Sequence, residues 1–488
     1  MRVSPTQTAT GSEPQTHRPR PLDVALRVLL RVEDGAYSNL ALSAEFAKTH
    51  LPDAERALVT ELCYGTLRQW HRVERALAAQ TPRGLKALDP TAHTLLRLGA
   101  YQLLFMKAQP HFVVDAVVQA VKKRRGAALA GFVNAVLRKL ATQGEPALPP
   151  YPVLKSGSDV NKAVAALALH HGLPRFWVAQ FVAALPNVDE AQAFFQAMNE
   201  PASTWLRLNP LKCSLEQALE ALRREVSEPP KQHPIQTDAV ELVGGHPFAG
   251  PAYGRGLFTA QDLSAQWVTR FLLSPTESGP LVLPPGPILD SCAGVGGKTC
   301  HLATLLHNER EIDAVDILPR KLELLSDHAH RLGCKGIRPV CGDLLDERAP
   351  IRSEYAAVLL DAPCSGSGVL RRHPEARLRT PKLDELVALQ ARLLDRAAAL
   401  VAPSGVLVYS VCSLFLSEGP EQIAAFCARH HDFVPLPPSP DDPLFRAGPQ
   451  PLCEKHAPYS FRTFPHRHNA DGFYVARLRR SCPVKQPE

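Results

Sequence analysis

The segment Val358–His373 reads VLLDAPCSGSGVLRRH. Its first three residues are apolar, and Asp361 and Cys364 follow them just before two glycines, Gly366 and Gly368. An apolar run that leads into polar residues and a glycine-rich loop is typical of a buried parallel strand. Ligands of open α/β sheets bind at the carboxyl ends of such strands. The segment therefore predicts a parallel α/β sheet with an acid and a thiol at its ligand-binding edge.

A second thiol follows another predicted strand. Residues 405–411 read GVLVYSV, and Cys412 comes directly after them. Two cysteines at two strand ends, one of them beside an acid, indicate covalent chemistry at an electrophilic ring carbon. A thiolate that adds to carbon 6 of a pyrimidine makes carbon 5 nucleophilic enough to attack a methyl donor. The base must leave its stack for this reaction. The spacing does not decide which of Cys364 and Cys412 is the nucleophile.

A glycine-rich loop predicts a cofactor site at the same edge of the sheet. Residues 291–298 read SCAGVGGK, between a predicted strand and a predicted helix. Asp316 ends the next strand, and an acid about 20 residues beyond such a loop binds ribose hydroxyls in Rossmann-like sites. Asp343 follows the third strand. The loop fits neither GxGxxG nor GxxxxGK[ST], so the pattern favours an adenosine-containing ligand such as S-adenosylmethionine over a phosphate cradle.

The C-terminal part of the chain alternates strands and helices from residue 287 onwards. Such alternation predicts a doubly wound parallel sheet. Strands are predicted at 288–290, 312–316, 337–341, 357–361 and 406–411, an antiparallel pair at 460–464 and 473–478, and helices at 298–306, 319–332, 383–401 and 419–429.

The N-terminal part, residues 21–140, predicts a helical bundle. Its expected helices cover 22–46, a long stretch from Asp53 to Leu77, 92–106, 113–123 and 128–140. The basic residues of the last two helices either form a solvated face or bind RNA phosphates without sequence specificity. They are Lys122, Lys123, Arg124, Arg125, Arg138 and Lys139.

The middle of the chain predicts a proline-rich linker and then a small α/β module. Residues 143–152 read QGEPALPPYP, which is typical of a linker. A strand at 204–208, an amphipathic helix at 215–225 with Ser214 as its N-cap, and strands near 239–243 form the module.

Composition limits the class of protein. The 488 residues carry a net charge of +7 and are 45% hydrophobic, as expected of a protein with several cored domains. The mild positive balance permits a polyanionic partner. Eleven cysteines without a secretion signal indicate reduced thiols in the cytoplasm. No CxxC pair occurs, so no metal site is expected. No apolar run could cross a bilayer, and residues 1–19 predict disorder.

The motifs resemble those of a known family. In this order, SCAGVGGKT, AVDI, the GD at 342–343, LLDAPCSGSGVLRRHPE and LVYSVCS resemble the RNA 5-methylcytosine methyltransferases of the Sun type. In the bundle, RALVTELCYGTLRQW and FVNAVLRKL resemble the NusB-like domain fused to the branch that modifies 16S ribosomal RNA. The resemblance implies a Rossmann-like class I methyltransferase domain, preceded by an all-α NusB-like bundle and a small α/β RNA-binding subdomain. Its expected boundaries are 1–19 for the disordered N-terminus, 20–142 for the NusB-like domain, 143–168 for the linker, 169–260 for the small subdomain and 261–480 for the methyltransferase domain.

The resemblance also implies residue roles. Cys412 matches the nucleophile that attacks carbon 6, Cys364 the thiol that assists release of the adduct, and Asp361 the acid that contacts the target base. Arg371, Arg372 and His373 are expected to contact RNA. The residues that match the S-adenosylmethionine site are Cys292, Ala293, Gly294, Val295, Gly296, Gly297, Lys298, Asp316, Asp343 and Asp361.

The sequence departs from the family at the cofactor loop. Gly294 and Val295 stand where the family commonly has Ala and Pro, which loosens the loop. Val411 replaces the usual Thr beside Cys412. The leading hypothesis is methylation of cytosine carbon 5 in 16S ribosomal RNA, free or in an assembling small subunit, by a monomer. Two alternatives are a tRNA cytosine-5 methyltransferase and a non-catalytic RNA-binding assembly factor.

Overall fold

The structure is a computed structural model. It describes residues 20–81, 84–85, 88–146, 159–185, 187–447 and 451–482. The predicted disordered N-terminus, 1–19, lies outside the described residues. The chain divides into two compact units, residues 1–149 and 150–488. In the described part of the chain, no helix is both long and apolar enough to cross a membrane.

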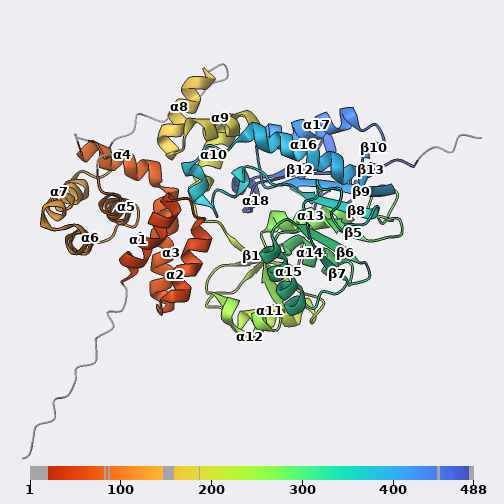
Figure 1. Cartoon of the computed structure of the whole chain (residues 1–488), viewed down its shortest axis with the longest axis horizontal. Coiled ribbons are helices and arrows are strands. Elements are labelled where there is room, and N and C mark those ends of the chain that lie inside the picture. Colours follow the sequence, from red (N-terminus) through yellow and green to blue (C-terminus); the bar gives the residue numbers. More distant parts are fainter. Residues whose placement is uncertain are drawn as a thin grey trace, which may run out of the picture. The chain divides into compact units, whose positions relative to one another are not determined.

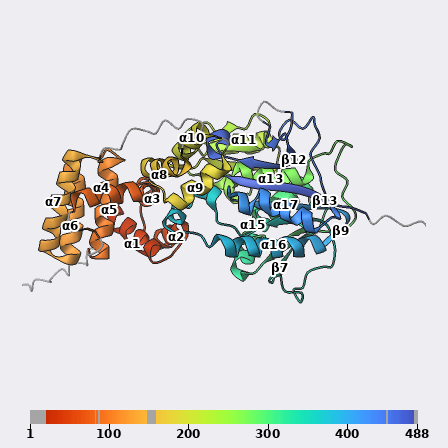
Figure 2. The same cartoon turned by 90° about the horizontal axis from the view of Figure 1, so that it is seen from above.

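The first unit is a helical bundle, as the sequence predicts (Figure 2). One expected helix, 22–46, is in fact two, because Gly35 has a φ of +111° and interrupts it. The long helix expected from Asp53 is also divided, at Gln69. The helices are α1 (Pro21–Glu33), α2 (Ser38–Lys48), α3 (Asp53–Arg68), α4 (Trp70–Gln80), α5 (Pro90–Leu104), α6 (Pro110–Arg125) and α7 (Ala127–Gln143).

Charged side chains join the helices of this bundle. Arg97 of α5 donates to Glu33 of α1 over 2.8 Å, and its guanidinium lies 4.0 Å from the centre of the Trp70 ring. Of the six basic residues expected either on a solvated face or at RNA phosphates, two form ion pairs with carboxylates of the bundle. Arg124 lies 2.7 Å from Asp23, and Arg125 lies 2.8 Å from Asp89. The other four, Lys122, Lys123, Arg138 and Lys139, are exposed.

The second unit contains the predicted doubly wound sheet. Its strand order is β11-β12-β13-β9-β8-β5-β6-β7, and β10 pairs with β13. Strands β9, β8, β5, β6 and β7 are parallel, whereas β13 is antiparallel to both of its neighbours in that order. The strands are β5 (Ile288–Asp290), β6 (Ile312–Asp316), β7 (Ile337–Cys341), β8 (Tyr355–Asp361), β9 (Val401–Val411), β10 (Phe433–Pro435), β11 (Cys453–Glu454), β12 (Ala457–Thr463) and β13 (Phe473–Arg480).

Helices cover both faces of this sheet, with α16 and α17 on one face and α13, α14 and α15 on the other (Figure 1). Alternate strand residues therefore enter different cores. Leu359 and Val408 pack with α13, whereas Leu360 and Leu407 pack with α16. The helices are α13 (Leu263–Leu273), α14 (Gly297–Leu305), α15 (Pro319–Leu332), α16 (Leu383–Ala399) and α17 (Pro420–Arg429).

The predicted strands at 288–290, 312–316 and 337–341 and the helix at 319–332 are confirmed residue for residue. Strands β8 and β9 begin earlier than expected because Tyr355 pairs with Val401 across an irregularity in the ladder. The predicted antiparallel pair near the C-terminus is also confirmed, as β12 and β13.

A second, smaller sheet has the order β2-β3-β1-β4 and is antiparallel. The predicted strand 204–208 and the N-cap at Ser214 are confirmed, and Gln217 completes a capping box there. Its elements are β1 (Thr204–Leu208), α11 (Leu215–Arg223), β2 (Lys231–Gln232), β3 (Ala239–Leu242), α12 (Pro251–Gly254) and β4 (Phe258–Ala260).

Three helices precede this sheet: α8 (Val160–His171), α9 (Arg175–Ala184) and α10 (Val188–Met198). Helix α8 occupies part of the stretch expected as a linker. The aromatic side chains of Trp177 and Phe181 pack on Phe415, three residues beyond Cys412. Helix α9 therefore packs against the loop that follows β9.

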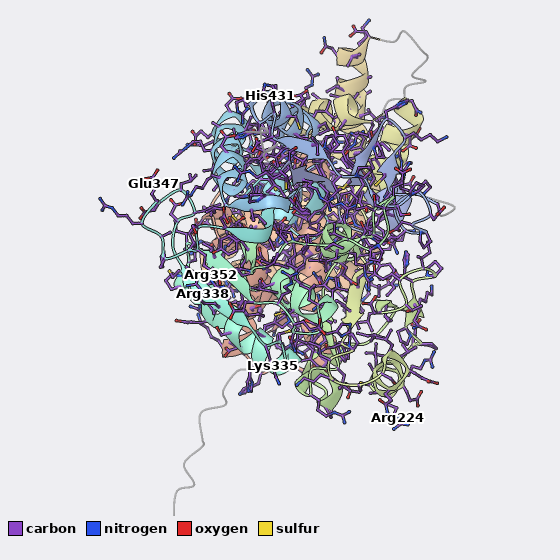
Figure 3. The ribbon with its side chains drawn as sticks, turned by 90° about the vertical axis from the view of Figure 1, so that its right-hand side faces the viewer. Arg224, Lys335, Arg338, Glu347, Arg352 and His431 are labelled. Carbon is purple, nitrogen blue, oxygen red and sulfur yellow. The ribbon has the colours of Figure 1, made fainter. Side chains whose placement is uncertain are left out.

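The amino ends of the parallel strands are held by ion pairs. Asp313 of β6 is buried and binds Arg338 of β7 at 2.5 Å, with Arg352 3.5 Å away. Figure 3 labels these two arginines close together. The site residues lie at the opposite, carboxyl ends of the strands.

Candidate active site

Acids and thiols gather where the parallel strands end. Asp290, Asp316 and Asp361 are the last residues of β5, β6 and β8, and Cys412 directly follows β9. Parallel strands present their carboxyl ends at one edge of the sheet, which is where ligands of such folds bind.

The two predicted catalytic thiols are neighbours. The Sγ atoms of Cys364 and Cys412 lie 3.3 Å apart, and both residues are partly exposed. The loops that carry them are joined, because the Gly368 N–H donates to the Cys412 carbonyl over 3.0 Å. The hydrogen bond to Cys412, together with burial, raises the pKa of Cys364 well above its ordinary value. Cys364 is therefore a thiol at neutral pH.

Asp361 and Lys298 form an ion pair beside the thiols. Lys298 Nζ lies 2.6 Å from Asp361 Oδ2, and the Ser410 hydroxyl donates to Asp361 Oδ1 over 2.7 Å. Burial lowers the pKa of Lys298 while the Asp361 carboxylate raises it, and the net pKa lies above the ordinary value. The Lys298 ammonium also lies 5.2 Å from the centre of the Phe473 ring. Lys298 is thus a fixed cation that orients Asp361.

A pocket of about 320 Å³ opens at this edge of the sheet. Four of the predicted cofactor residues line it: Cys292, Asp316, Asp343 and Asp361. Its remaining walls combine apolar and polar side chains, namely Ser291, Ile317, Lys321, Gly342, Leu344, Leu345, Pro363, Leu389 and Leu393. Burial raises the pKa of the Cys292 thiol, so Cys292 lines the pocket as an uncharged thiol.

The predicted cofactor residues 293–298 do not line the pocket but form the turn next to it. Gly294 has a φ of +56°, which favours glycine, and its N–H donates to Asp316 Oδ2 over 3.0 Å. Gly296 has a φ of +83°, and a Cβ there would lie 2.6 Å from Leu325 Cγ. Val295 is 51% exposed. Glycine at 294 therefore suits the backbone of this turn, although the family commonly has Ala there.

The pocket fits an adenosine-containing cofactor. Asp316 accepts from Gly294, Leu318 and Lys321, which leaves acceptor capacity on its carboxylate for a hydroxyl donor. Asp343 is exposed at the mouth, and leucine side chains supply a flat apolar wall. Acids on one side and aliphatic groups on the other suit a ribose and a purine ring, respectively.

The structure corrects two of the predicted RNA contacts. Arg371 is buried and donates to the Pro201 carbonyl. Arg372 lies 2.6 Å from Asp471 and 2.7 Å from Asp262, so its charge is neutralised within the fold. Both arginines therefore connect distant chain segments, although 30% of the Arg372 side chain is exposed. His373 remains partly exposed.

Sequence reasoning missed several side chains of the site. Ser410 and Phe473 contact Asp361 and Lys298, respectively, and Asp290 accepts a 2.7 Å hydrogen bond from Thr299 beside the cofactor turn. Glu418 is fully buried between the two cysteine loops. An acid six residues beyond Cys412 in a mainly apolar stretch was the available signal for Glu418.

Comparison with known families identifies three regions of the chain. Residues 281–479 match the family described as 16S rRNA methyltransferase RsmB/F. Residues 20–142 match the NusB family, and residues 173–249 match the RsmF/B-like ferredoxin-like domain.

Two relatives of similar length agree with these matches, and a solved structure has a similar fold. The probable ribosomal RNA small subunit methyltransferase B of Bacillus subtilis is 30% identical over 94% of this chain and 98% of its own length. The ribosomal RNA small subunit methyltransferase B of Klebsiella pneumoniae is 32% identical, covering 87% and 90%. The crystal structure of PH0851 superposes with a TM-score of 0.75 at 23% identity, covering 94% of this chain and 98% of that one.

Proposed function

Because this chain belongs to the 16S rRNA methyltransferase RsmB/F family, we propose that it methylates carbon 5 of a cytosine in 16S ribosomal RNA. The methyl donor in this proposal is S-adenosylmethionine, bound in the pocket lined by Cys292, Asp316, Asp343 and Asp361. The protein would act as a monomer in the cytoplasm, on free RNA or on an assembling small subunit.

The observation that carries the proposal is the 3.3 Å approach of two thiols beside an acid and a cofactor-sized pocket. An RNA methyltransferase that modified a nucleophilic ring nitrogen would need no thiol, since such an atom can attack a methyl donor directly. Carbon 5 of a pyrimidine needs activation, which a covalent bond to carbon 6 supplies. A pair of thiols near Asp361, which lines the pocket, therefore favours carbon 5 as the methylated atom.

In the proposed reaction, the Cys412 thiolate forms a bond to carbon 6 of a base turned out of its stack. Asp361, held by Lys298 and Ser410, contacts the polar edge of that base and orients it. When bound, S-adenosylmethionine supplies an electrophilic methyl group. Carbon 5 gains the methyl group and loses its proton to a base, and the electron pair of that C–H bond expels Cys412. Cys364, as a neutral thiol, protonates the departing sulfur.

Bisulfite mapping of RNA tests the proposal. RNA from cells that lack this protein is mapped before and after incubation with the enzyme and S-adenosylmethionine. The expected result is one new 5-methylcytosine in 16S RNA, as naked RNA or as purified small-subunit precursors. A new mark only in tRNA would change the substrate and keep the chemistry. No mark in any of these RNAs, with folded protein, would contradict the proposal and favour a non-catalytic assembly factor.

A further inference from the structure

The side chain of Glu418 forms hydrogen bonds to both of the loops that carry Cys364 and Cys412. Glu418 lies at the end of a short 3-10 turn, Leu416–Glu418, and its side chain is fully buried. Its Oε1 accepts from the Ser365 N–H over 2.8 Å and from Gln390 Nε2 over 2.9 Å. Its Oε2 accepts from the hydroxyls of Ser365 and Ser413, each over 2.5 Å. All four lone-pair positions of the carboxylate are thus used.

The two serines bound by Glu418 are the residues that directly follow the two cysteines. Ser365 comes after Cys364, and Ser413 comes after Cys412. Ser413 is fully buried as well, and its hydroxyl also lies 2.9 Å from the Ser367 hydroxyl. The backbone of Glu418 is held in place as well, because the Tyr409 hydroxyl donates to the Glu418 main-chain carbonyl over 2.7 Å. One carboxylate therefore binds the residue beside each thiol, through the backbone N–H and hydroxyl of Ser365 and through the hydroxyl of Ser413.

We infer that Glu418 is a positioning residue that sets the separation of Cys364 and Cys412 by binding the serine beside each of them. Together with the roles of the two thiols, this inference rests on the proposed function. Removing the carboxylate would leave the two loops joined mainly by the Gly368–Cys412 backbone bond and by serine–serine contacts. The thiols would then sample longer separations.

The charge of Glu418 has a second consequence. Among the described residues, no Lys, Arg or His forms an ion pair with it, so hydrogen-bond donors alone compensate its charge. The contact with Cys412 and burial raise the pKa of Cys364, and the negative charge of Glu418 raises it further. Lys298 lies on the other side, where its positive charge interacts with Cys412.

Glu418→Gln tests this inference with little change in shape. The variant keeps an acceptor for the Ser365 N–H and removes the negative charge. Glu421→Gln is the matched control, because Glu421 is an exposed carboxylate on the following helix. The pH dependence of iodoacetamide alkylation is followed separately at Cys364 and Cys412 by peptide mass spectrometry. This readout needs neither RNA nor cofactor, so it remains informative if the proposed methylation fails.

The expected result for Glu418→Gln is an alkylation rate of Cys364 at pH 7.5 that rises about tenfold, since loss of a nearby negative charge lowers a thiol pKa. Glu421→Gln should match the parent protein. A purely structural role for Glu418 would lower stability without a selective shift in the Cys364 pH profile. Equal Cys364 profiles in folded Glu418→Gln and parent protein would overturn the inference.

Ser413→Ala provides a second variant that keeps the charge. It removes one hydroxyl that binds Glu418 on the Cys412 side. With S-adenosylmethionine and RNA that carries 5-fluorocytidine, the methylated adduct to the enzyme is trapped, because its carbon 5 has no proton to lose. We expect adduct formation to slow about tenfold, the loss expected for a hydrogen bond to a buried charge. Trapping at the parental rate in folded Ser413→Ala would contradict the positioning role.

Discussion

The Sγ atom of Cys364 lies 3.3 Å from the Sγ atom of Cys412, at the ends of two neighbouring parallel strands. This distance allows one sulfur to donate a hydrogen bond to the other. A thiolate at one position and a thiol at the other is the arrangement that both addition to a ring and release from it require. The pair therefore predicts opposite defects when each cysteine is removed.

Cys412→Ala should abolish methyl transfer, because no sulfur remains to bond to carbon 6. Cys364→Ala should still form the covalent adduct and accumulate it, because the thiol that assists release is missing. Denaturing gels of enzyme incubated with labelled RNA and S-adenosylmethionine separate these cases. Cys427→Ala, on α17, serves as the control and should behave as the parent. Full activity of Cys412→Ala would refute the covalent mechanism.

Gly368→Ala should damage both the site and the fold. A Cβ at this position would lie 1.8 Å from the carbonyl oxygen of Gly472, so the loop that carries Cys364 would have to move. We expect a loss of about 1–3 kcal/mol in the free energy of unfolding. A shift of that loop should also cost about 100-fold in methyl transfer.

Gly131→Ala is the matched control for the Gly368 variant. Gly131 lies in helix α7 with open space around the position of a Cβ, so the substitution should add about 0.5–1 kcal/mol of stability. Urea unfolding and methyl-transfer rates measure both variants. Parental activity and stability of Gly368→Ala would show that the Gly368–Gly472 approach is not needed.

Local sequence patterns predicted the strands of the catalytic sheet well, because buried parallel strands are short apolar runs that end in polar residues. The same patterns located Asp361, Cys364 and Cys412 at one edge of the sheet. They could not locate Glu418 or Ser410, whose importance depends on contacts with residues distant in the sequence. Hydrogen-bond partners across 49 or 53 residues leave no periodic signal.

The positions of basic residues in the sequence were the least reliable guide to RNA contacts. Arg371 and Arg372 follow a predicted catalytic loop, which favoured RNA contact, yet both are used within the fold. Arg124 and Arg125 likewise form ion pairs with acids of the bundle, although the pair of Arg125 lies at its surface. A basic residue in a sequence shows only that a charge exists, and the tertiary structure decides whether an acid of the same protein already neutralises it.

Arg372→Gln should destabilise the protein by about 3–5 kcal/mol, because it leaves the carboxylates of Asp262 and Asp471 buried without their cation. Arg224→Gln is a suitable control, since Arg224 forms an exposed pair with Glu220 that is worth at most about 1 kcal/mol. Chemical unfolding at neutral pH measures both. If Arg372→Gln weakened RNA binding at parental stability, the original expectation of an RNA contact would be restored.

The last prediction concerns the pH dependence of stability. Burial raises the pKa of Asp290 from 3.8 to about 6, so the folded protein holds a proton that the unfolded chain releases near pH 4. Between these two values the folded state binds more protons, and stability from this group falls as the pH rises. A pKa shift of this size corresponds to about 3 kcal/mol of free energy of unfolding. This contribution is fully lost once the pH exceeds the pKa of Asp290 in the folded protein.

Asp290→Asn removes this titration and keeps an acceptor for Thr299. The free energy of unfolding of the variant, minus that of the parent, should therefore rise by about 3 kcal/mol between about pH 3 and pH 8. Taking the difference cancels the titrations of groups that do not interact with Asp290. Asp384→Asn, at an exposed carboxylate, should give a nearly flat difference. A flat difference for Asp290→Asn as well would mean that Asp290 ionises in the folded protein as readily as in the unfolded chain, and that burial at the cofactor turn does not hold its proton.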